Sequence, residues 1–236
     1  MFIVSEIGLN HLGDEKKALN MVKELIKHKI PAITFQIRED SYYNGEKPHK
    51  RKLSNKFYLS ISILLKENNI KFGITIAGTN DNMQEDLISF FVNECEIDFW
   101  KTLSYSNSEY NFIQKIYDTS LPVYMSLGLS SNENIIKAKE LYPNINFIYT
   151  NLSRDIKDCG LSNLTKIKEY NTNLAYGLHC DDVNICYIAM AYDIIGLFFY
   201  VKMDEDVVYP DNQGLLIDNI TDYIENINLY SKAIKK

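Results

Sequence analysis

The sequence predicts an α/β fold, a single (β/α)8 TIM barrel, and three observations support this prediction. Short apolar segments of strand type alternate with amphipathic helical segments from end to end. Eight such pairs follow one another without a break in composition, which is typical of one barrel. The length of 236 residues is close to the roughly 250 residues usual for this fold. We therefore expect residues 1–236 to form one domain.

The expected strands are short runs rich in Ile, Val, Phe and Tyr, residues whose branched or aromatic side chains favour extended backbone. In chain order, the eight expected strands are Phe2–Ile7, Ala32–Ile37, Phe72–Ile76, Asp98–Leu103, Pro122–Leu127, Asn146–Asn151, Asn173–His179 and Gly196–Met203.

The expected helices begin at residues whose side chains can accept a hydrogen bond from the first free amides. Asp14 and Ser54 occupy such positions. The fifth helix starts near Ser131 and stops before Pro143. The eight expected helices are Asp14–His28, Ser54–Asn68, Asn82–Cys95, Ser106–Tyr117, 131–142, Ser162–Tyr170, Asp182–Tyr192 and Ile217–Lys235. A doubly wound sheet is the alternative, but the turn Gly8–Gly13 lacks the GxGxxG spacing of a dinucleotide site.

Composition and charge limit the possible partners. The net charge is −6 without a basic patch, so we expect no nucleic-acid partner. No apolar run approaches the roughly 20 residues that cross a bilayer, and the first residues do not resemble a signal peptide. The four cysteines form no CxxC pair, which favours reduced thiols in the cytoplasm. The polar insertion Arg38–Lys52 follows the second strand and is interpreted either as a lid over the site or as a disordered loop.

Nearly every expected strand delivers a polar side chain at its C-terminal end, where TIM barrels place their chemistry. A buried Glu or Lys needs partners, so converging groups of this kind favour a pocket for an anionic, hydroxyl-rich ligand. A structural ion pair between Glu6 and Lys101, and helix-capping roles for the hydroxyls, remain alternatives. The candidates are Glu6, Asn10, His11, Gln36, Thr75, Lys101, Ser104, Ser126, Thr150, Asn151, His179, Tyr200 and Lys202.

Eight motifs resemble, in the same order, those of the sialic acid synthase family. The segment SEIGLNHLG at Ser5–Gly13 is similar to the family's AEIGxNHxG, and ITFQ at Ile33–Gln36 to its strand ending in KFQ. The other matches, to YKIxS, PVILSTGM, CTN, GYSDHT, IEKH and PDH, fall on Trp100–Ser104, Pro122–Gly128, Tyr149–Asn151, Ala175–Cys180, Leu197–Tyr200 and Pro210–Asn212.

The resemblance implies an enzyme of nonulosonic acid biosynthesis that condenses phosphoenolpyruvate, or a related small anion, with an N-acyl amino sugar. It implies catalytic roles for Glu6, Lys101 and His179, the last also as a ligand of a divalent metal, Mn²⁺ or Mg²⁺. It implies a homodimer. The remaining candidates, together with Tyr176 of the GYSDHT match, would contact the two substrates: Asn10, His11, Gln36, Thr75, Ser104, Ser126, Thr150, Asn151, Tyr176, Tyr200 and Lys202.

Several positions depart from the family's motifs. The lysine of KFQ is Thr34, which removes a phosphate-binding charge, and the second metal-binding histidine is Tyr200. The C-terminal antifreeze-like domain of the family has no counterpart in these residues. Two alternatives therefore stay open beside the synthase: a barrel that binds a sugar or a partner enzyme without turnover, and an aldolase that forms a Schiff base at Lys101.

Overall fold

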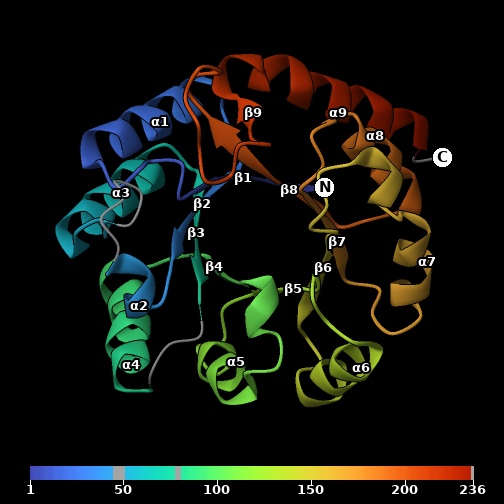
Figure 1. Ribbon diagram of the computed structural model, residues 1–236. Helices are drawn as coiled ribbons and strands as arrows, with labels where there is room; N and C mark the ends of the chain where they lie inside the picture. The colour runs from blue at the N-terminus through green and yellow to red at the C-terminus, as the bar shows by residue number, and fades with distance from the viewer. Residues whose placement is uncertain (45–50, 78–80, 235–236) are drawn as a thin grey trace.

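The computed structural model describes residues 1–44, 51–77 and 81–234 and shows a closed barrel of eight parallel strands. Each strand pairs with the next one in sequence, and β1 pairs with β8 to close the barrel (Figure 1). The predicted fold class is confirmed. The strands are β1 (Phe2–Gly8), β2 (Ala32–Ile37), β3 (Lys71–Ile76), β4 (Phe99–Thr102), β5 (Val123–Ser126), β6 (Asn146–Tyr149), β7 (Leu174–Leu178) and β8 (Gly196–Lys202).

A shell of helices surrounds the barrel. The main helices are α1 (Glu15–Lys27), α3 (Asn55–Glu67), α4 (Asp81–Ser89), α5 (Tyr110–Tyr117), α6 (Asn132–Leu141), α7 (Ser162–Lys168), α8 (Ile185–Ala189) and α9 (Ile220–Ile234). The two predicted caps are confirmed, because the side chains of Asp14 and Ser54 accept hydrogen bonds from backbone amides of the first turns of α1 and α3. Ser131 caps α6 in the same way.

Several parts of the chain differ from the sequence-based expectation or lie outside the described residues. A short helix, α2 (Asp40–Tyr43), lies inside the polar insertion Arg38–Lys52, whose residues 45–50 are outside the described part. The third expected helix ends in a π-helical turn (Phe90–Glu94), and a two-residue strand, β9 (Leu215–Leu216), pairs with β8. The predicted end of the last helix, Lys235, also lies outside the described residues.

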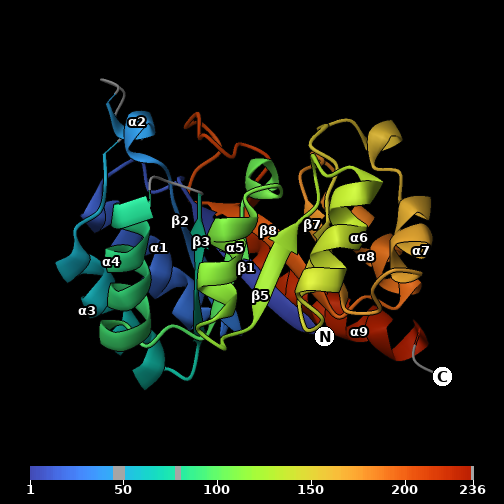
Figure 2. The same ribbon diagram turned by 90° about the horizontal axis from the view of Figure 1, so that it is seen from below.

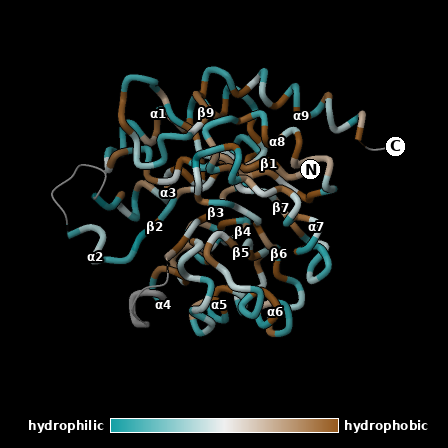
Figure 3. Tube along the Cα trace, turned by 45° about the vertical axis from the view of Figure 1, so that its right-hand side comes forward, coloured by the Kyte–Doolittle hydropathy of each residue, from teal (hydrophilic) through white to brown (hydrophobic). Residues whose placement is uncertain are grey.

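Alternation along the strands separates an inner from an outer set of side chains. Val4 and Glu6 point into the barrel, whereas Ile3 and Ile7 point toward the helices and join the main hydrophobic core. The outer set packs with the apolar faces of the helices, for example Phe35 against Phe57 and Tyr58 of α3. Figure 3 shows hydrophobic segments concentrated along the strands.

Aromatic rings fill the N-terminal half of the barrel. Phe2, Phe99, Tyr124 and Phe198 come from four strands, and their ring centroids lie 5.2–6.3 Å apart. Gly73 makes room for this layer, since a Cβ there would lie 2.2 Å from the Phe99 ring. We call these four residues the aromatic floor. It leaves only the C-terminal end of the barrel for polar groups.

The C-terminal end of the barrel is partly covered by two segments. In Figure 2, α2 and the loop between β8 and β9 rise at the same end of the barrel, opposite the N-terminus. The β8–β9 loop is anchored by Asn10, whose amide donates to the carbonyls of Val201 (2.8 Å) and Asp211 (3.1 Å) and accepts from the amide of Asp211 (3.0 Å). In the described part of the chain, no helix has the length and apolar character to cross a bilayer.

Candidate active site

An ion pair lies at the centre of the barrel. The Lys101 ammonium of β4 contacts the Glu6 carboxylate of β1, and both side chains are at least nine-tenths buried. The Lys101 Nζ also lies 5.8 Å from the centroid of the Phe198 ring and 5.7 Å from that of Tyr200. Such a pair persists in an apolar interior because each charge compensates the other.

Two serines beside this pair form a small polar cradle. Ser104 follows β4, Ser126 ends β5, and their hydroxyl oxygens are 2.8 Å apart. Gly128 keeps the space above them open, since a Cβ there would lie 2.7 Å from the Ser104 hydroxyl and 3.0 Å from the Thr150 methyl. We call Ser104, Ser126, Gly128 and Thr150 the serine cradle. Its hydroxyls can donate to the oxygens of a carboxylate or a phosphate.

Three threonine hydroxyls inside the barrel lack partners. Thr34 of β2, Thr75 of β3 and Thr150 after β6 are almost fully buried, and none of their hydroxyls has a hydrogen-bond partner among the residues described. Gln36 lies two residues beyond Thr34 on the same inner face and is 6% exposed. Unpartnered buried hydroxyls cost free energy, which is typical of functional interiors rather than of a packed core.

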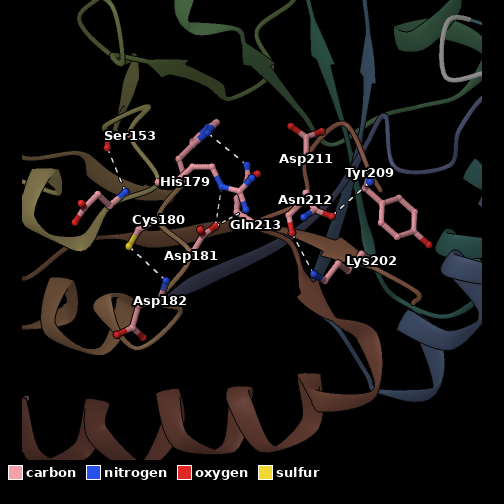
Figure 4. Close-up of polar contacts among 12 residues, drawn as sticks. Ser153, His179, Cys180, Asp181, Asp182, Lys202, Tyr209, Asp211, Asn212 and Gln213 are labelled. Carbon is pink, nitrogen blue, oxygen red and sulfur yellow. Dashed lines mark hydrogen bonds and ion pairs between the residues drawn. The ribbon is translucent and has the colours of Figure 1, made fainter. Parts of the chain in front are cut away.

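His179 lies where β7 ends, against the edge of the Tyr200 ring, with centroids 5.6 Å apart. Its Nδ1 is 3.5 Å from the Gln213 side-chain nitrogen of the β8–β9 loop (Figure 4). Burial, with a smaller effect from the Lys101 charge, lowers the pKa of His179 to about 4. The imidazole is therefore neutral at physiological pH. Burial, followed by the charges of Asp211 and Glu6, holds the Tyr200 phenol protonated by raising its pKa well above 10.

These residues do not fit a divalent metal. Within the described ranges, no group of three His, Cys, Asp or Glu side chains is placed to hold an ion. A protonated phenol faces His179 where the resemblance implies a second histidine. The acidic residues that follow are engaged elsewhere: Asp181 binds Arg154, and Asp182 accepts from Asn184. Mn²⁺ or Mg²⁺ would need ligands that this arrangement does not bring together.

Asp211 of the β8–β9 loop enters the site from above. Its carboxyl would lie 2.9 Å from a Cβ at Gly8, and the Tyr200 ring contacts the same point. One carboxyl oxygen has no hydrogen-bond partner within the described chain. Burial and then the negative charge of Glu6 raise the pKa of Asp211 to about 7, against opposing effects from Leu9, Lys101 and Arg38. This group therefore exchanges a proton near neutral pH.

A cation–aromatic cluster forms the opposite rim. The Arg38 guanidinium carbon lies 4.4 Å from the Tyr42 ring centroid and 5.1 Å from that of Tyr105. Arg38 Nε and Nη2 donate to the two carboxylate oxygens of Glu39 at 3.0 and 2.9 Å. The Tyr105 hydroxyl donates to Glu39 at 2.9 Å. Tyr105 directly follows Ser104, so this cluster adjoins the serine cradle.

The structure brings together one part of the predicted site. Two of the predicted catalytic residues, Glu6 and Lys101, touch each other, and the third, His179, lies against Tyr200. Inner-face positions are also occupied by the predicted substrate contacts Gln36, Thr75, Ser126 and Thr150, and Ser104 contacts Ser126.

Other predicted substrate contacts are corrected. Tyr176 points outward, among Cys159, Cys180 and Cys186, because it has the same strand parity as Leu174 and Leu178. His11 packs near Phe35 of the outer layer and accepts from the Gly13 amide (2.9 Å). Burial lowers the pKa of His11 to about 4. All four described cysteines are free and buried.

Three further predicted contacts already bind the protein itself. The Asn10 amide anchors the β8–β9 loop, as described above. The Asn151 amide donates to the Asp158 carbonyl (2.6 Å) and accepts from the Ser153 amide (2.8 Å). The Lys202 ammonium donates to the Asn212 carbonyl (3.1 Å), as Figure 4 shows. These side chains therefore help to hold the loops around the site.

Sequence reasoning did not identify Arg38, Tyr105, Gly128 and Asp211 as site residues. Arg38 had a usable signal, because it lies two residues beyond Gln36 and thus continues the inner face of β2. Strand periodicity gave no signal for Asp211, because this residue lies in an irregular loop that the Asn10 side chain holds in position.

Comparison with known proteins agrees with this geometry. A model of the NeuB family matches residues 19–233. An uncharacterized protein of Methanocaldococcus jannaschii is 26% identical over 254 residues, which span 99% of this chain and 72% of that protein. Most of the chain, including seven of the eight barrel strands, is thus covered by the family model.

Solved structures share the fold. The N-acetylneuraminic acid (sialic acid) synthetase of Leptospira borgpetersenii, in complex with citrate, is 21% identical with a TM-score of 0.87, covering 100% of this chain and 85% of that one. The spore coat polysaccharide biosynthesis protein of Bacillus subtilis is 14% identical with a TM-score of 0.84, covering 100% and 70%. A truncated 3-deoxy-D-arabino-heptulosonate 7-phosphate synthase of Thermotoga maritima is 11% identical with a TM-score of 0.73, covering 99% and 87%.

Proposed function

Because the chain belongs to the NeuB family, we propose that it is a sugar-acid synthase that joins phosphoenolpyruvate, or a related small anion, to an N-acyl amino sugar. The observation that supports this proposal most directly is the serine cradle beside the buried Lys101–Glu6 pair. Paired hydroxyls next to an ammonium are suited to a ligand that bears a carboxylate and a phosphate. The name of the Leptospira relative points to the same class of reaction.

In the proposed reaction, the methylene carbon of phosphoenolpyruvate, which is next to its enol carbon, forms a bond to the carbonyl carbon of the sugar. The sugar carbonyl oxygen takes up a proton, water adds at the former enol position, and inorganic phosphate leaves. The serine cradle and Lys101 would hold the three-carbon substrate, and Gln36 and Glu6 would face the sugar. Asp211, with its pKa raised to about 7 by burial and by Glu6, is suited to exchange the proton.

Binding without turnover is the second candidate, and one observation favours it. The phenol of Tyr200 faces His179, and the described side chains do not assemble a metal site. A synthase that depends on a Lewis acid would be slowed strongly by this change. The protein would then hold a sugar or a partner enzyme in the same barrel mouth.

Phosphate release separates the two candidates. The purified protein is incubated with phosphoenolpyruvate and a panel of N-acyl hexosamines, with and without added Mn²⁺. A synthase releases phosphate only when both substrates are present, and Ser126→Ala lowers the rate by about 10-fold or more. Ser60→Ala, on the exposed surface of α3, is the matched control and should leave the rate unchanged. Calorimetric binding of a sugar without phosphate release would instead support the second candidate.

A further inference from the structure

Among the described residues, the cationic groups deep inside the barrel are paired or neutral. Lys101 is compensated by Glu6, with which it is in contact. His179 is neutral at physiological pH because burial lowers its pKa to about 4. Position 34, where the resemblance implies a lysine, is a threonine. A phosphorylated three-carbon acid carries several negative charges, so a site that binds it needs a further cation.

Arg38 is placed to provide this cation. It follows β2 directly and continues the inner-face series of Thr34 and Gln36. Its side chain is 22% exposed, so a ligand entering the barrel mouth can reach it without displacing the core. The Arg38 charge lowers the pKa of both Asp211 and Tyr200. Arg38 therefore lies at the same end of the barrel as these two residues.

The guanidinium is held in a fixed orientation. The rings of Tyr42 and Tyr105 lie 4.4 and 5.1 Å from its central carbon, and Glu39 binds its Nε and Nη2. The backbone N–H of Arg38 donates to the Tyr43 hydroxyl (3.0 Å), which fixes the start of the side chain as well. A guanidinium held in this way loses little conformational entropy when it binds an anion.

Tyr105 connects this cation to the serine cradle. It directly follows Ser104, and its hydroxyl binds the same Glu39 carboxylate that orients Arg38. The Arg38 guanidinium thus lies over the ring of the residue that follows Ser104 in the chain. One hydroxyl of the Ser104–Ser126 pair donates to the other, so the cradle offers one further O–H donor beside the charged donor of Arg38.

We propose that Arg38 binds the phosphate of the three-carbon substrate from the rim of the barrel, supplying the charge that Thr34 does not provide. This assignment rests on the proposed function, because it assumes that a phosphorylated substrate enters the mouth. It differs from the pattern implied by the resemblance, in which the cation comes from within strand β2. Arg38 is thus a substrate-binding residue specific to the present arrangement of side chains.

Calorimetric titration of the full chain with inorganic phosphate and with phosphoenolpyruvate tests the assignment. Loss of one charged hydrogen-bonding partner in Arg38→Gln should weaken both ligands by about 10- to 100-fold. Arg38→Lys should recover part of the affinity, since it restores the charge without the planar fork. Binding to the wild type should weaken as salt is raised, and this salt dependence should be smaller in Arg38→Gln.

Lys52→Gln is the matched control. Lys52 is also a cation of this rim, paired with Asp40 and stacked at 5.2 Å on the Tyr43 ring, but it is 44% exposed and should not change phosphate affinity. Circular dichroism and thermal unfolding confirm that each variant is folded. Equal phosphate affinity in the wild type and Arg38→Gln, or no phosphate binding by the wild type, overturns the assignment.

The outcome is distinguishable from failure of the proposed function. If phosphate binds in an Arg38-dependent manner but no sugar supports phosphate release, the synthase proposal fails and the anion site stands. If turnover occurs, Arg38→Gln should raise the KM for phosphoenolpyruvate and leave the KM for the sugar unchanged. Turnover with an unchanged KM for phosphoenolpyruvate in that variant rejects Arg38 while retaining the synthase.

Discussion

Lys101 and Glu6 are in contact across the barrel interior, although 95 residues separate them in the sequence and two strands lie between β1 and β4. The pair therefore ties the first strand to the fourth through side chains rather than through the backbone ladder. Its burial makes it costly to disrupt, since either partner alone would be an uncompensated charge in an apolar interior.

Removal of one member of this pair should destabilise the protein strongly. We expect Glu6→Gln and Lys101→Met each to lower the free energy of unfolding by about 3–5 kcal/mol. The double variant should be far more stable than the sum of the two losses suggests, because no unpaired charge remains. Urea denaturation of the four proteins measures this coupling. Additive losses would contradict the prediction and indicate that the two charges do not depend on each other.

Asn10 should control the order of the β8–β9 loop. Asn10→Ala removes three hydrogen bonds, to Val201 and to both backbone groups of Asp211, and should cost about 1–3 kcal/mol. Amide hydrogen exchange should accelerate across residues 203–214 and remain unchanged in α6. Asn68→Ala, which removes an exposed side-chain bond at the end of α3, serves as the control. Uniform acceleration over the whole chain would argue against a local role.

The Asp211 carboxyl should make stability decrease as the pH rises. Its folded-state pKa of about 7 exceeds the ordinary value near 4, so its stabilising effect is present at low pH and is lost between about pH 4 and 7. Asp211→Asn cannot ionise and escapes this loss. Each tenfold change in proton affinity is worth about 1.4 kcal/mol, so the variant should gain on the order of a few kcal/mol relative to the wild type.

Thermal unfolding of both proteins from pH 5 to pH 8 measures this effect. The difference in Tm, variant minus wild type, should increase with pH. His11 and His179 have the opposite effect, because burial lowers their pKa values to about 4 and stability rises as the pH exceeds this value. Both proteins contain these histidines, so their contribution cancels in the difference. A Tm difference that is constant with pH would show that Asp211 ionises normally.

Thr75→Val should stabilise the protein. The Thr75 hydroxyl is buried without a hydrogen-bond partner among the described residues. The methyl group that replaces it in valine has nearly the same shape and needs no hydrogen bond. We expect a gain of about 1 kcal/mol. Thr102→Val on the neighbouring strand is the contrasting variant, since it removes an acceptor for the Ser126 amide (3.3 Å) and should destabilise. Chemical denaturation distinguishes the two, and a loss of stability in Thr75→Val would mean that its hydroxyl is bonded.

The regular part of the fold was predictable because it follows local rules. All eight strands lie within two residues of their expected ends, since runs of branched and aromatic residues mark each one. The caps at Asp14 and Ser54 followed from single side chains and the amides beside them. Strand β9 was missed because its pairing depends on the loop that Asn10 holds, a contact between residues about 200 positions apart in the sequence.

Site residues were predictable only where the alternation along a strand determines whether a side chain points into the barrel. Glu6 and Lys101 share inward parity, and their contact follows from barrel closure. Tyr176 was misplaced because a motif match does not reveal which face of a strand a residue occupies. Asn151 and Lys202 lie near strand ends as expected, yet loop carbonyls take up their polar groups. Such competition for hydrogen bonds is set by tertiary structure and is not visible in residue spacing.

The aromatic floor of Phe2, Phe99, Tyr124 and Phe198 closes the N-terminal end of the barrel. A ligand can therefore enter the interior only from the C-terminal end. Two molecules that meet inside such an interior cannot pass each other. The one that occupies the deeper position must therefore bind first. Initial-rate and product-inhibition measurements on an active preparation should therefore show compulsory-order rather than random-order kinetics.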